Sequence, residues 1–237
     1  EKYYQKDYFV KGNNKRSYDD YSSEEQSLRQ TFKKRVEKLE IKATKPGSVL
    51  DVGCAYGYFL DEIPSTWDKH GLEISSHAAQ VAKKINPKAK IISGKLKEDT
   101  FPGQKFELIT LWDVIEHLDK PKKDLETVYD KLKTNGRIAL TTGDVESFIA
   151  KLSGKHWHLY NPPQHLSYFS PKTIKKLLKD IGFKNIQVAH PPAYYPLSYV
   201  SHKIENLYKI KLQIPDKVSS IIMPINLWDT MLVTTHK

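Results

Sequence analysis

Short apolar runs alternate with amphipathic stretches through the middle of the chain. Five runs have the length and composition of buried strands, and they lie at 48–52, 69–74, 91–93, 106–111 and 136–142. Apolar residues recur at helical spacing in the intervals, at 58–63, 75–85 and 122–132. This alternation predicts an α/β fold, built on a mostly parallel sheet with right-handed crossovers and helices on both faces.

A polar and aromatic segment precedes this alternating region. Ser22 or Ser23 can cap a helix, and the apolar positions of that helix recur at Leu28, Phe32, Val36 and Leu39. The sequence Lys45-Pro46-Gly47 ends the helix. We therefore expect residues 1–45 to form an N-terminal lid and helix, followed by a core at 46–146.

The pattern becomes looser in the C-terminal half, residues 147–237. We expect a helix at 171–181 that ends at Gly182, a strand at 185–189 and a last strand at 227–235. Between these strands, residues 194–225 mix Tyr, Leu and Ile with Lys and several prolines. This segment is expected to be a substrate-covering insertion, with an amphipathic helix at 200–212.

Composition restricts the class of protein. Of the 237 residues, 39% are hydrophobic and 28% charged, which can bury a sizeable core and excludes a wholly disordered chain. The only cysteine is Cys54, so neither an intramolecular disulfide nor a cysteine-rich zinc site can form. No apolar run reaches the ~18 residues of a membrane-spanning helix, and the first residues do not resemble a signal peptide. We expect a soluble, cytoplasmic protein.

A turn rich in small residues follows the first apolar run and reads Asp51-Val52-Gly53-Cys54-Ala55-Tyr56-Gly57-Tyr58. Glycine at 53 and 57 permits positive φ and close approach of a ligand to the backbone. N–H groups at the start of the following helix favour polar or anionic ligand groups. A dinucleotide fingerprint would need glycine at position 58, where Tyr58 stands. Cys54 is interpreted as a small packing residue rather than a nucleophile.

Three segments resemble, in the right order, motifs of class I S-adenosylmethionine-dependent methyltransferases. The turn resembles their first motif, D-x-G-x-G-x-G, with Ala55 in place of the middle glycine. Residues 106–118 resemble the fourth-strand motif and 141–144 the fifth-strand motif. The group that the sequence resembles most contains small-molecule O-methyltransferases of the ubiquinone-biosynthesis and polysaccharide type. The resemblance covers residues 8–183, and it implies a Rossmann-like, seven-stranded sheet whose last strand is antiparallel.

The resemblance also implies a cofactor, S-adenosylmethionine, with S-adenosylhomocysteine as product. Asp51 is expected near the amine of the donor, and Glu73, at the tip of the second strand, is expected to accept hydrogen bonds from the ribose. Lys95 stands where many relatives have aspartate, so adenine is expected to be held by backbone groups and apolar packing. The expected cofactor-binding residues are Asp51, Gly53, Cys54, Ala55, Tyr56, Gly57, Tyr58, Glu73, Ile74, Lys95, Leu96, Trp112 and Tyr18.

Tyr18 belongs to a tyrosine-rich segment that resembles the lid of this group, which folds over the donor pocket. Aromatic faces near a sulfonium gain roughly 1 kcal/mol from cation–π attraction, or more when desolvated. The alternative is that these tyrosines cover an apolar flank of the protein. The sequence leaves both interpretations open.

Two histidines are candidates for a general base that activates a hydroxyl group. His117 follows the fourth strand, at the edge of the sheet where ligands bind. His165 lies in a segment, 157–169, that resembles the W-x(n)-P-x-H-L-x-x-F segment of small-molecule methyltransferases. Asp113, Glu116 and His117 also resemble a cluster that has been linked to a divalent metal in quinone O-methyltransferases. The alternative is that Glu116 and His117 brace the neighbouring helix, and no metal ligand is assigned.

Net charge raises the question of partners. Lys and Arg number 38 and Asp and Glu 28, so the formal net charge is 38 − 28 = +10. A small-molecule acceptor is the expected partner, and the predicted reaction is O-methylation. The alternative is a tRNA or rRNA methyltransferase, or a nucleic-acid-binding protein, that uses basic runs such as Lys33-Lys34-Arg35. Peripheral contact of the 194–225 insertion with an anionic membrane is a further expectation.

Overall fold

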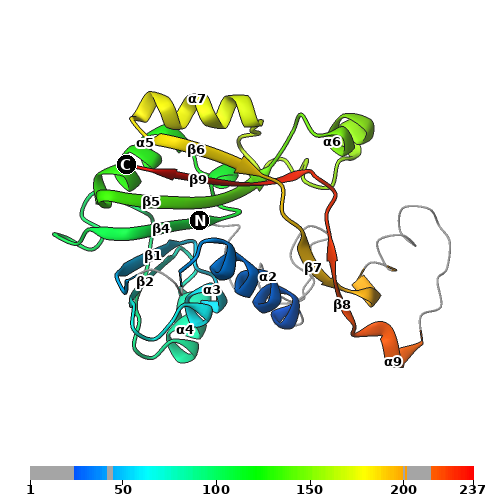
Figure 1. The fold of residues 1–237 in the computed structure, drawn as a ribbon, viewed down its shortest axis with the longest axis horizontal. Coiled ribbons are helices and arrows are strands. Elements are labelled where there is room, and N and C mark those ends of the chain that lie inside the picture. Colours follow the sequence, from blue (N-terminus) through cyan, green and yellow to red (C-terminus); the bar gives the residue numbers. More distant parts are fainter. Residues whose placement is uncertain (1–23, 42–44, 200, 202–214) are drawn as a thin grey trace.

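The computed structural model describes residues 24–41, 45–199, 201 and 215–237 (Figure 1). One seven-stranded sheet, in the order β3-β2-β1-β4-β5-β9-β6, forms the centre of the molecule. Its strands are β1 (Ser48–Val52), β2 (Asp68–Glu73), β3 (Lys90–Ser93), β4 (Phe106–Trp112), β5 (Leu132–Gly143), β6 (Lys184–Ala189) and β9 (Thr230–His236).

Strands β1 to β5 pair in parallel, and β9 runs antiparallel to both β5 and β6. The prediction of a mostly parallel, seven-stranded sheet with an antiparallel last strand is therefore confirmed. The last strand begins later than expected, at Thr230, because Trp228 has φ +58° and its N–H donates to the side chain of Asn226. This turn replaces the first residues of the predicted strand.

Helices cover both faces of the sheet (Figure 1). The helical elements are α2 (Glu25–Lys38), α3 (Tyr58–Glu62), α4 (Ser76–Ile85), α5 (Pro121–Lys131), α6 (Phe148–Ser153), α7 (Pro171–Ile181) and α9 (Asp216–Ser219), with two 3-10 turns, η1 (Ile115–His117) and η2 (Gly154–His156). Helices α5 and α7 lie on one face, and α2, α3 and α4 lie on the other (Figure 1). No helix among the described residues has the length and apolar content needed to span a bilayer.

Successive side chains along each strand belong to the two core layers on opposite faces of the sheet. Leu50 and Ile109 belong to the buried cluster that contains residues of α5 and α7. Val49 and Leu108, one position earlier on the same strands, belong to the cluster that contains residues of α2, α3 and α4. Successive side chains of a strand point to opposite faces, so an apolar run without alternation requires cover on both sides. This requirement explains why these strands could be recognised from continuous apolar runs.

A second, two-stranded sheet consists of β7 (Ala193–Pro196) and β8 (Ile222–Ile225), which pair antiparallel. These strands form the two ends of the predicted 194–225 insertion. The backbone N–H of Tyr194 donates to Thr31 Oγ1 of α2 (3.0 Å), so β7 is attached to the N-terminal helix. Most of the amphipathic helix expected at 200–212 lies outside the described residues.

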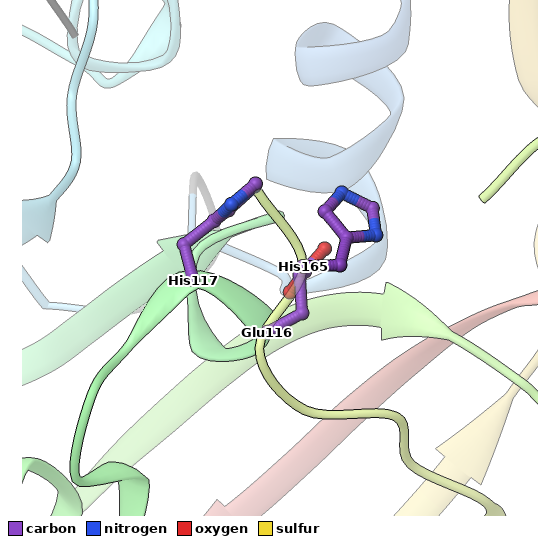
Figure 2. A group of neighbouring side chains, drawn as sticks. All are labelled: Glu116, His117 and His165. Atoms are coloured by element: carbon purple, nitrogen blue, oxygen red, sulfur yellow. The ribbon is translucent and has the colours of Figure 1, made fainter. Parts of the chain in front are cut away.

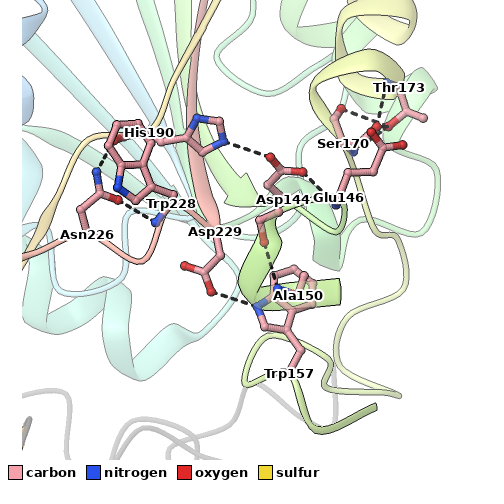
Figure 3. Close-up of polar contacts among 11 residues, drawn as sticks. Asp144, Glu146, Ala150, Trp157, Ser170, Thr173, His190, Asn226, Trp228 and Asp229 are labelled. Atoms are coloured by element: carbon pink, nitrogen blue, oxygen red, sulfur yellow. Dashed lines mark hydrogen bonds and ion pairs between the residues drawn. The ribbon is translucent and has the colours of Figure 1, made fainter. Parts of the chain in front are cut away.

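A polar network joins the segment after β5 to the ends of β6 and β9 (Figure 3). Asp144 accepts a hydrogen bond from the Glu146 N–H (2.9 Å) and lies 3.0 Å from His190 Nε2. Asp229 accepts from the indole N–H of Trp157 (2.9 Å). Both carboxylates are buried. These bonds fix the start of the long segment that leads to His165.

Candidate active site

The carboxyl ends of β1, β2 and β4 surround a cavity of about 970 Å³. This volume is at the upper end of the ~300–1,000 Å³ typical of small-molecule sites. The strand order reverses beside β1, and ligands of open α/β sheets bind in the crevice at such a point. Of the residues expected from the sequence, the cavity is lined by Asp51, Gly53, Cys54, Ala55, Glu73, Ile74, Lys95, Leu96, Trp112 and His117.

The remaining expected residues lie elsewhere. Tyr56, Gly57, Tyr58 and His165 do not line the cavity. Gly57 begins α3 with φ +80°, and a Cβ atom there would lie 2.6 Å from Asn86 Nδ2. Tyr56 and Tyr58 are buried in an apolar cluster beneath the turn, so these three residues support the turn from below. Tyr18 lies outside the described residues.

The glycine-rich turn itself contains three residues with positive φ, which are Gly53, Ala55 and Gly57. Gly53 has φ +74°, and a Cβ atom there would lie 2.5 Å from Val114 Cγ2. Ala55, in the place of the family's middle glycine, has φ +47°. The N–H groups of Gly53 and Cys54 both donate to the Leu72 carbonyl (2.7 and 3.1 Å). The turn is therefore fastened to β2 and presents its backbone to the cavity.

Glu73 is held by two backbone N–H groups at the tip of β2. Its Oε1 accepts from Ser75 N (2.8 Å) and its Oε2 from Ala55 N (2.9 Å). Burial raises the pKa of this carboxyl, and the backbone hydrogen bonds oppose that shift. A carboxylate has about four acceptor positions. The positions that the backbone does not use can accept hydrogen bonds from a ligand in the cavity.

Asp51 forms a second acidic position in the same wall. Its Oδ1 accepts a hydrogen bond from the Thr110 hydroxyl (2.6 Å), and its side chain is almost fully buried. Burial raises the pKa of Asp51 to about 8, and the nearby Glu73 adds to the shift. A cation brought beside Asp51 favours the ionised form. This wall is therefore suited to a ligand that carries positive charge.

Apart from Lys95, the charged residues at the opposite wall were not assigned from the sequence. Gly94 donates its N–H to the Glu73 carbonyl (2.9 Å), which brings Lys95 and Leu96 to the cavity. Lys95 Nζ lies 3.8 Å from Asp119 Oδ2, and both side chains are exposed. Lys97, Glu98, Asp99, Lys120, Lys123 and Asp124 also line this side. Their mixed signs gave no pattern that sequence reasoning could recognise as a site.

The two candidate bases meet at one end of the site. His117 and Glu116 belong to η1 and His165 to the segment after η2, and the three side chains point toward one another (Figure 2). The rings of His117 and His165 have centroids 4.7 Å apart. One ligand atom from each of the three residues lies within 4.8 Å of the others. The structure thus brings together both candidate bases and Glu116.

Hydrogen bonds orient both imidazole rings. His165 Nδ1 lies 2.7 Å from the Leu159 carbonyl, and His117 Nδ1 lies 2.9 Å from the Gln164 carbonyl. A carbonyl oxygen only accepts, so each Nδ1 carries a proton and each Nε2 carries the lone pair in the neutral ring. Burial lowers the pKa of His117 to about 4 and also lowers that of His165. Both rings are therefore neutral bases near pH 7.

The surroundings of Glu116 are compatible with both roles considered from the sequence, which are a metal ligand and a brace for neighbouring structure. Two imidazoles and a carboxylate suit a transition-metal ion better than Ca²⁺. Glu116 also braces its surroundings, because its Oε2 accepts from the Thr142 hydroxyl (2.9 Å) and its carbonyl accepts from Leu166 N (2.8 Å). Burial raises the pKa of Glu116 to about 8, and Asp113 adds to the shift. The protonated form of Glu116 serves the bracing role without a metal.

A family model described as a methyltransferase domain matches residues 24–188 of the 237-residue chain. The match covers α2 and the sheet as far as β6. It therefore includes the cavity, the glycine-rich turn and the histidine cluster.

Two curated relatives extend this similarity. An uncharacterized protein of Methanocaldococcus jannaschii is 28% identical over 170 residues, which is 72% of this chain and 78% of that protein. The mitochondrial ubiquinone biosynthesis O-methyltransferase of Schizosaccharomyces pombe is 28% identical over 102 residues. That match spans 40% of this chain and 37% of the relative's length.

The fold matches solved structures as well. A SAM-dependent methyltransferase from Archaeoglobus fulgidus superposes with a TM-score of 0.61 at 19% identity, and the match covers 92% of this chain and all (100%) of that one. At this identity the likeness shows the fold, and the family model shows the membership. The chain belongs to the methyltransferase domain family, and its fold is that of S-adenosylmethionine-dependent methyltransferases.

Proposed function

We propose that this protein transfers a methyl group from S-adenosylmethionine to an oxygen atom of a small molecule. The observation that carries the proposal is the pair of neutral imidazoles beside the donor cavity, each with its lone pair on Nε2. Removal of a proton from a hydroxyl group requires such a base, whereas an amine needs less activation. The O-methyltransferase name of one relative supports the same choice.

The residues of the cavity fit the donor. Glu73 is suited to bind the two ribose hydroxyls, because its carboxylate is fixed by Ser75 and Ala55 and keeps free acceptor positions. Asp51 is suited to bind the amine. The backbone at Gly53 and Ala55 can approach the methionine part closely, and Lys95, Leu96 and Trp112 border the space for adenine. When bound, S-adenosylmethionine supplies an electrophilic methyl group on a positively charged sulfur.

The chain contributes position and proton transfer. Methyl transfer is an in-line displacement, so alignment of the nucleophile with the donor accounts for much of the acceleration. His165 is held by the Leu159 carbonyl, and the nearby Asp113 favours the protonated ring. His165 Nε2 can therefore accept the proton of the acceptor hydroxyl, and Asp113 stabilises the imidazolium that results. His117, which lines the cavity, is the alternative base.

Binding of the donor is tested with Glu73→Ala. Calorimetry with S-adenosylhomocysteine is expected to show affinity reduced at least about tenfold, because the ribose loses its acceptor. Glu98→Ala is the matched control, since Glu98 lines the same cavity but is exposed. Equal affinity of Glu73→Ala and the native protein would remove Glu73 from the donor site.

The base and the acceptor atom are tested together. A panel of phenols, alcohols and amines is incubated with the donor, and methylated products are identified by mass spectrometry. We expect O-methyl products, and we expect His165→Ala to lower kcat by roughly 10²–10⁴ with donor affinity unchanged. His236→Ala, an exposed histidine on β9, is the control. Products methylated only on nitrogen would contradict O-methylation.

A further inference from the structure

Arg35 is a buried arginine that has no hydrogen-bond or ion-pair partner for its side chain in the described part of the chain. It lies in the last turn of α2 and is only 5% exposed. Among residues 24–41, 45–199, 201 and 215–237 its guanidinium forms no ion pair and no hydrogen bond. Arginine is almost never buried unless it is paired, because removal of an isolated charge from water is costly. The lack of a partner therefore requires an explanation.

The position of Arg35 on α2 places it on the same helix face as two residues that line the candidate active site. Leu28 and Phe32, which line the cavity, lie seven and three residues before Arg35 on one face of the helix. Side chains of a helix tilt toward its N-terminus, which here directs Arg35 back toward Phe32. The ring of Phe32 in turn packs against Trp112, at the end of β4, with centroids 6.1 Å apart. Arg35 thus lies on the face of α2 that covers the candidate active site.

The electrostatic neighbours of Arg35 are Asp113, which lines the cavity, and two tyrosines of β7. Burial lowers the pKa of the guanidinium, and Asp113, Tyr195 and Tyr194 oppose that shift. Asp113 also acts on His165. Asp113 therefore acts electrostatically on both Arg35 and the candidate base. Neither Arg35 nor His165 borders the donor cavity that contains Glu73.

We propose that Arg35 binds an anionic oxygen group, a carboxylate or a phosphate, of the methyl acceptor. The inference rests on the proposed function and names the class of its substrate. A guanidinium presents paired N–H donors that match either group bidentately. The substrate anion would supply the charge partner that the described residues do not, and it would fix the acceptor hydroxyl relative to His165. The positive net charge of the protein would favour the approach of such a substrate.

The probes are benzoate, phenyl phosphate and the neutral benzamide, whose binding is measured by calorimetry with S-adenosylhomocysteine present. We expect the native protein to bind at least one of the two anions and to bind benzamide much more weakly. Whichever anion binds more tightly identifies the group. Arg35→Met should lower the affinity for that anion at least about tenfold, while Arg35→Lys should retain part of the affinity. Arg29→Met is the matched control, because Arg29 is on the same helix but is ion-paired with Glu25 and Asp61.

A stability measurement separates a binding role from a structural one. If Arg35 is an uncompensated buried charge, Arg35→Met should raise the Tm of the ligand-free protein by about 2 °C or more, and the anion should raise the Tm of the native protein only. A variant that does not fold, or has a clearly lower Tm, would mean that the guanidinium is structural. That result would overturn the proposal.

Measurements of donor binding distinguish failure of the anionic-acceptor assignment from failure of the proposed methyl transfer. If Arg35→Met weakens S-adenosylhomocysteine but not the anions, the guanidinium binds the donor's own carboxylate and the acceptor assignment is overturned. If the native protein binds S-adenosylhomocysteine but neither anion, the proposed methyl transfer stands and the anionic acceptor does not. If the native protein does not bind S-adenosylhomocysteine at all, the proposed function itself is contradicted.

Discussion

Single residues in the glycine-rich turn differ in whether their surroundings leave space for a Cβ atom. Gly53 and Gly57 leave no room for a Cβ atom, which would lie 2.5 Å and 2.6 Å from neighbouring side chains. Ala55 has a Cβ atom and nevertheless adopts φ +47°. A non-glycine residue in this region carries strain of about 1–2 kcal/mol. All three positions of the D-x-G-x-G-x-G pattern therefore adopt positive φ, and two of them also exclude a Cβ atom.

Ala55→Gly tests this distinction. Glycine relieves the strain but increases the entropy of the unfolded chain, so we expect the free energy of unfolding to rise by about 0.5–1 kcal/mol. Urea unfolding followed by circular dichroism provides the measurement. Gly53→Ala and Gly57→Ala are the comparison variants, and both should lower stability. A loss of stability in Ala55→Gly would show that the alanine methyl group contributes packing that outweighs the strain.

Glu116 makes the stability of the folded protein depend on pH. Its pKa is about 8 in the folded protein, against an ordinary value of 4.5, because it is buried and close to Asp113. A raised carboxyl pKa means that the unfolded chain ionises first, so this residue lowers stability progressively as pH rises from 4.5 toward 8. The same burial makes Glu116 a proton-bearing brace for Thr142 at neutral pH.

Glu116→Gln should therefore stabilise the protein at pH 7 by about 1–3 kcal/mol, because the amide is neutral and its oxygen can still accept from Thr142. The advantage should shrink to about 0.4 kcal/mol at pH 4.5, where the folded protein carries the proton and half of the unfolded chains do. Denaturant unfolding at both pH values is the measurement. A native protein that is more stable than the variant at pH 7, and is stabilised further by added Zn²⁺, would instead favour a metal bound by Glu116, His117 and His165.

Among the elements, those that position the donor site could be predicted from the sequence. Strands β1 and β4 are recognisable because both of their faces are buried, and the turn after β1 because its glycines are required sterically. Lys33-Lys34-Arg35 illustrates what could not be predicted. The sequence grouped these residues as one basic run, but the helix exposes Lys33 and Lys34 and buries Arg35. Side-chain burial within a charged run depends on tertiary packing, which composition does not reveal.

The β7–β8 pair was also beyond sequence reasoning, because both strands are short and their exposure is intermediate or higher. Their attachment to α2 gives a prediction. Thr31→Val removes the acceptor of the Tyr194 N–H, so we expect faster amide exchange at Tyr194 and stability lower by about 0.5–1.5 kcal/mol. Thr31→Ser keeps the hydroxyl group and should behave like the native protein. Unchanged exchange at Tyr194 in Thr31→Val would show that other contacts hold β7 in place.

At the scale of the whole molecule, the net charge is +10, and the lysines of the described residues are distributed over several elements. Lys83 and Lys84 lie on α4 and Lys175 on α7, and these two helices cover opposite faces of the sheet (Figure 1). Other cations are offset locally, as in the ion pair of Lys176 with Asp180 (2.6 Å). A continuous basic surface is what binds a phosphate backbone, and counterion release from it produces steep salt dependence. The described residues do not gather their lysines in that way.

This distribution predicts the outcome of an RNA-binding experiment with the alternative class of substrate. A mixture of cellular tRNA and rRNA fragments is passed over the immobilised protein at low and at moderate salt. We expect weak retention that moderate salt abolishes without sequence or structure preference, because scattered lysines release few counterions together. Retention that persists at moderate salt and weakens in a variant with Lys33 and Lys34 replaced by glutamine would favour a nucleic-acid substrate. Methyl transfer to the retained RNA, measured with labelled donor, would then replace the small-molecule acceptor.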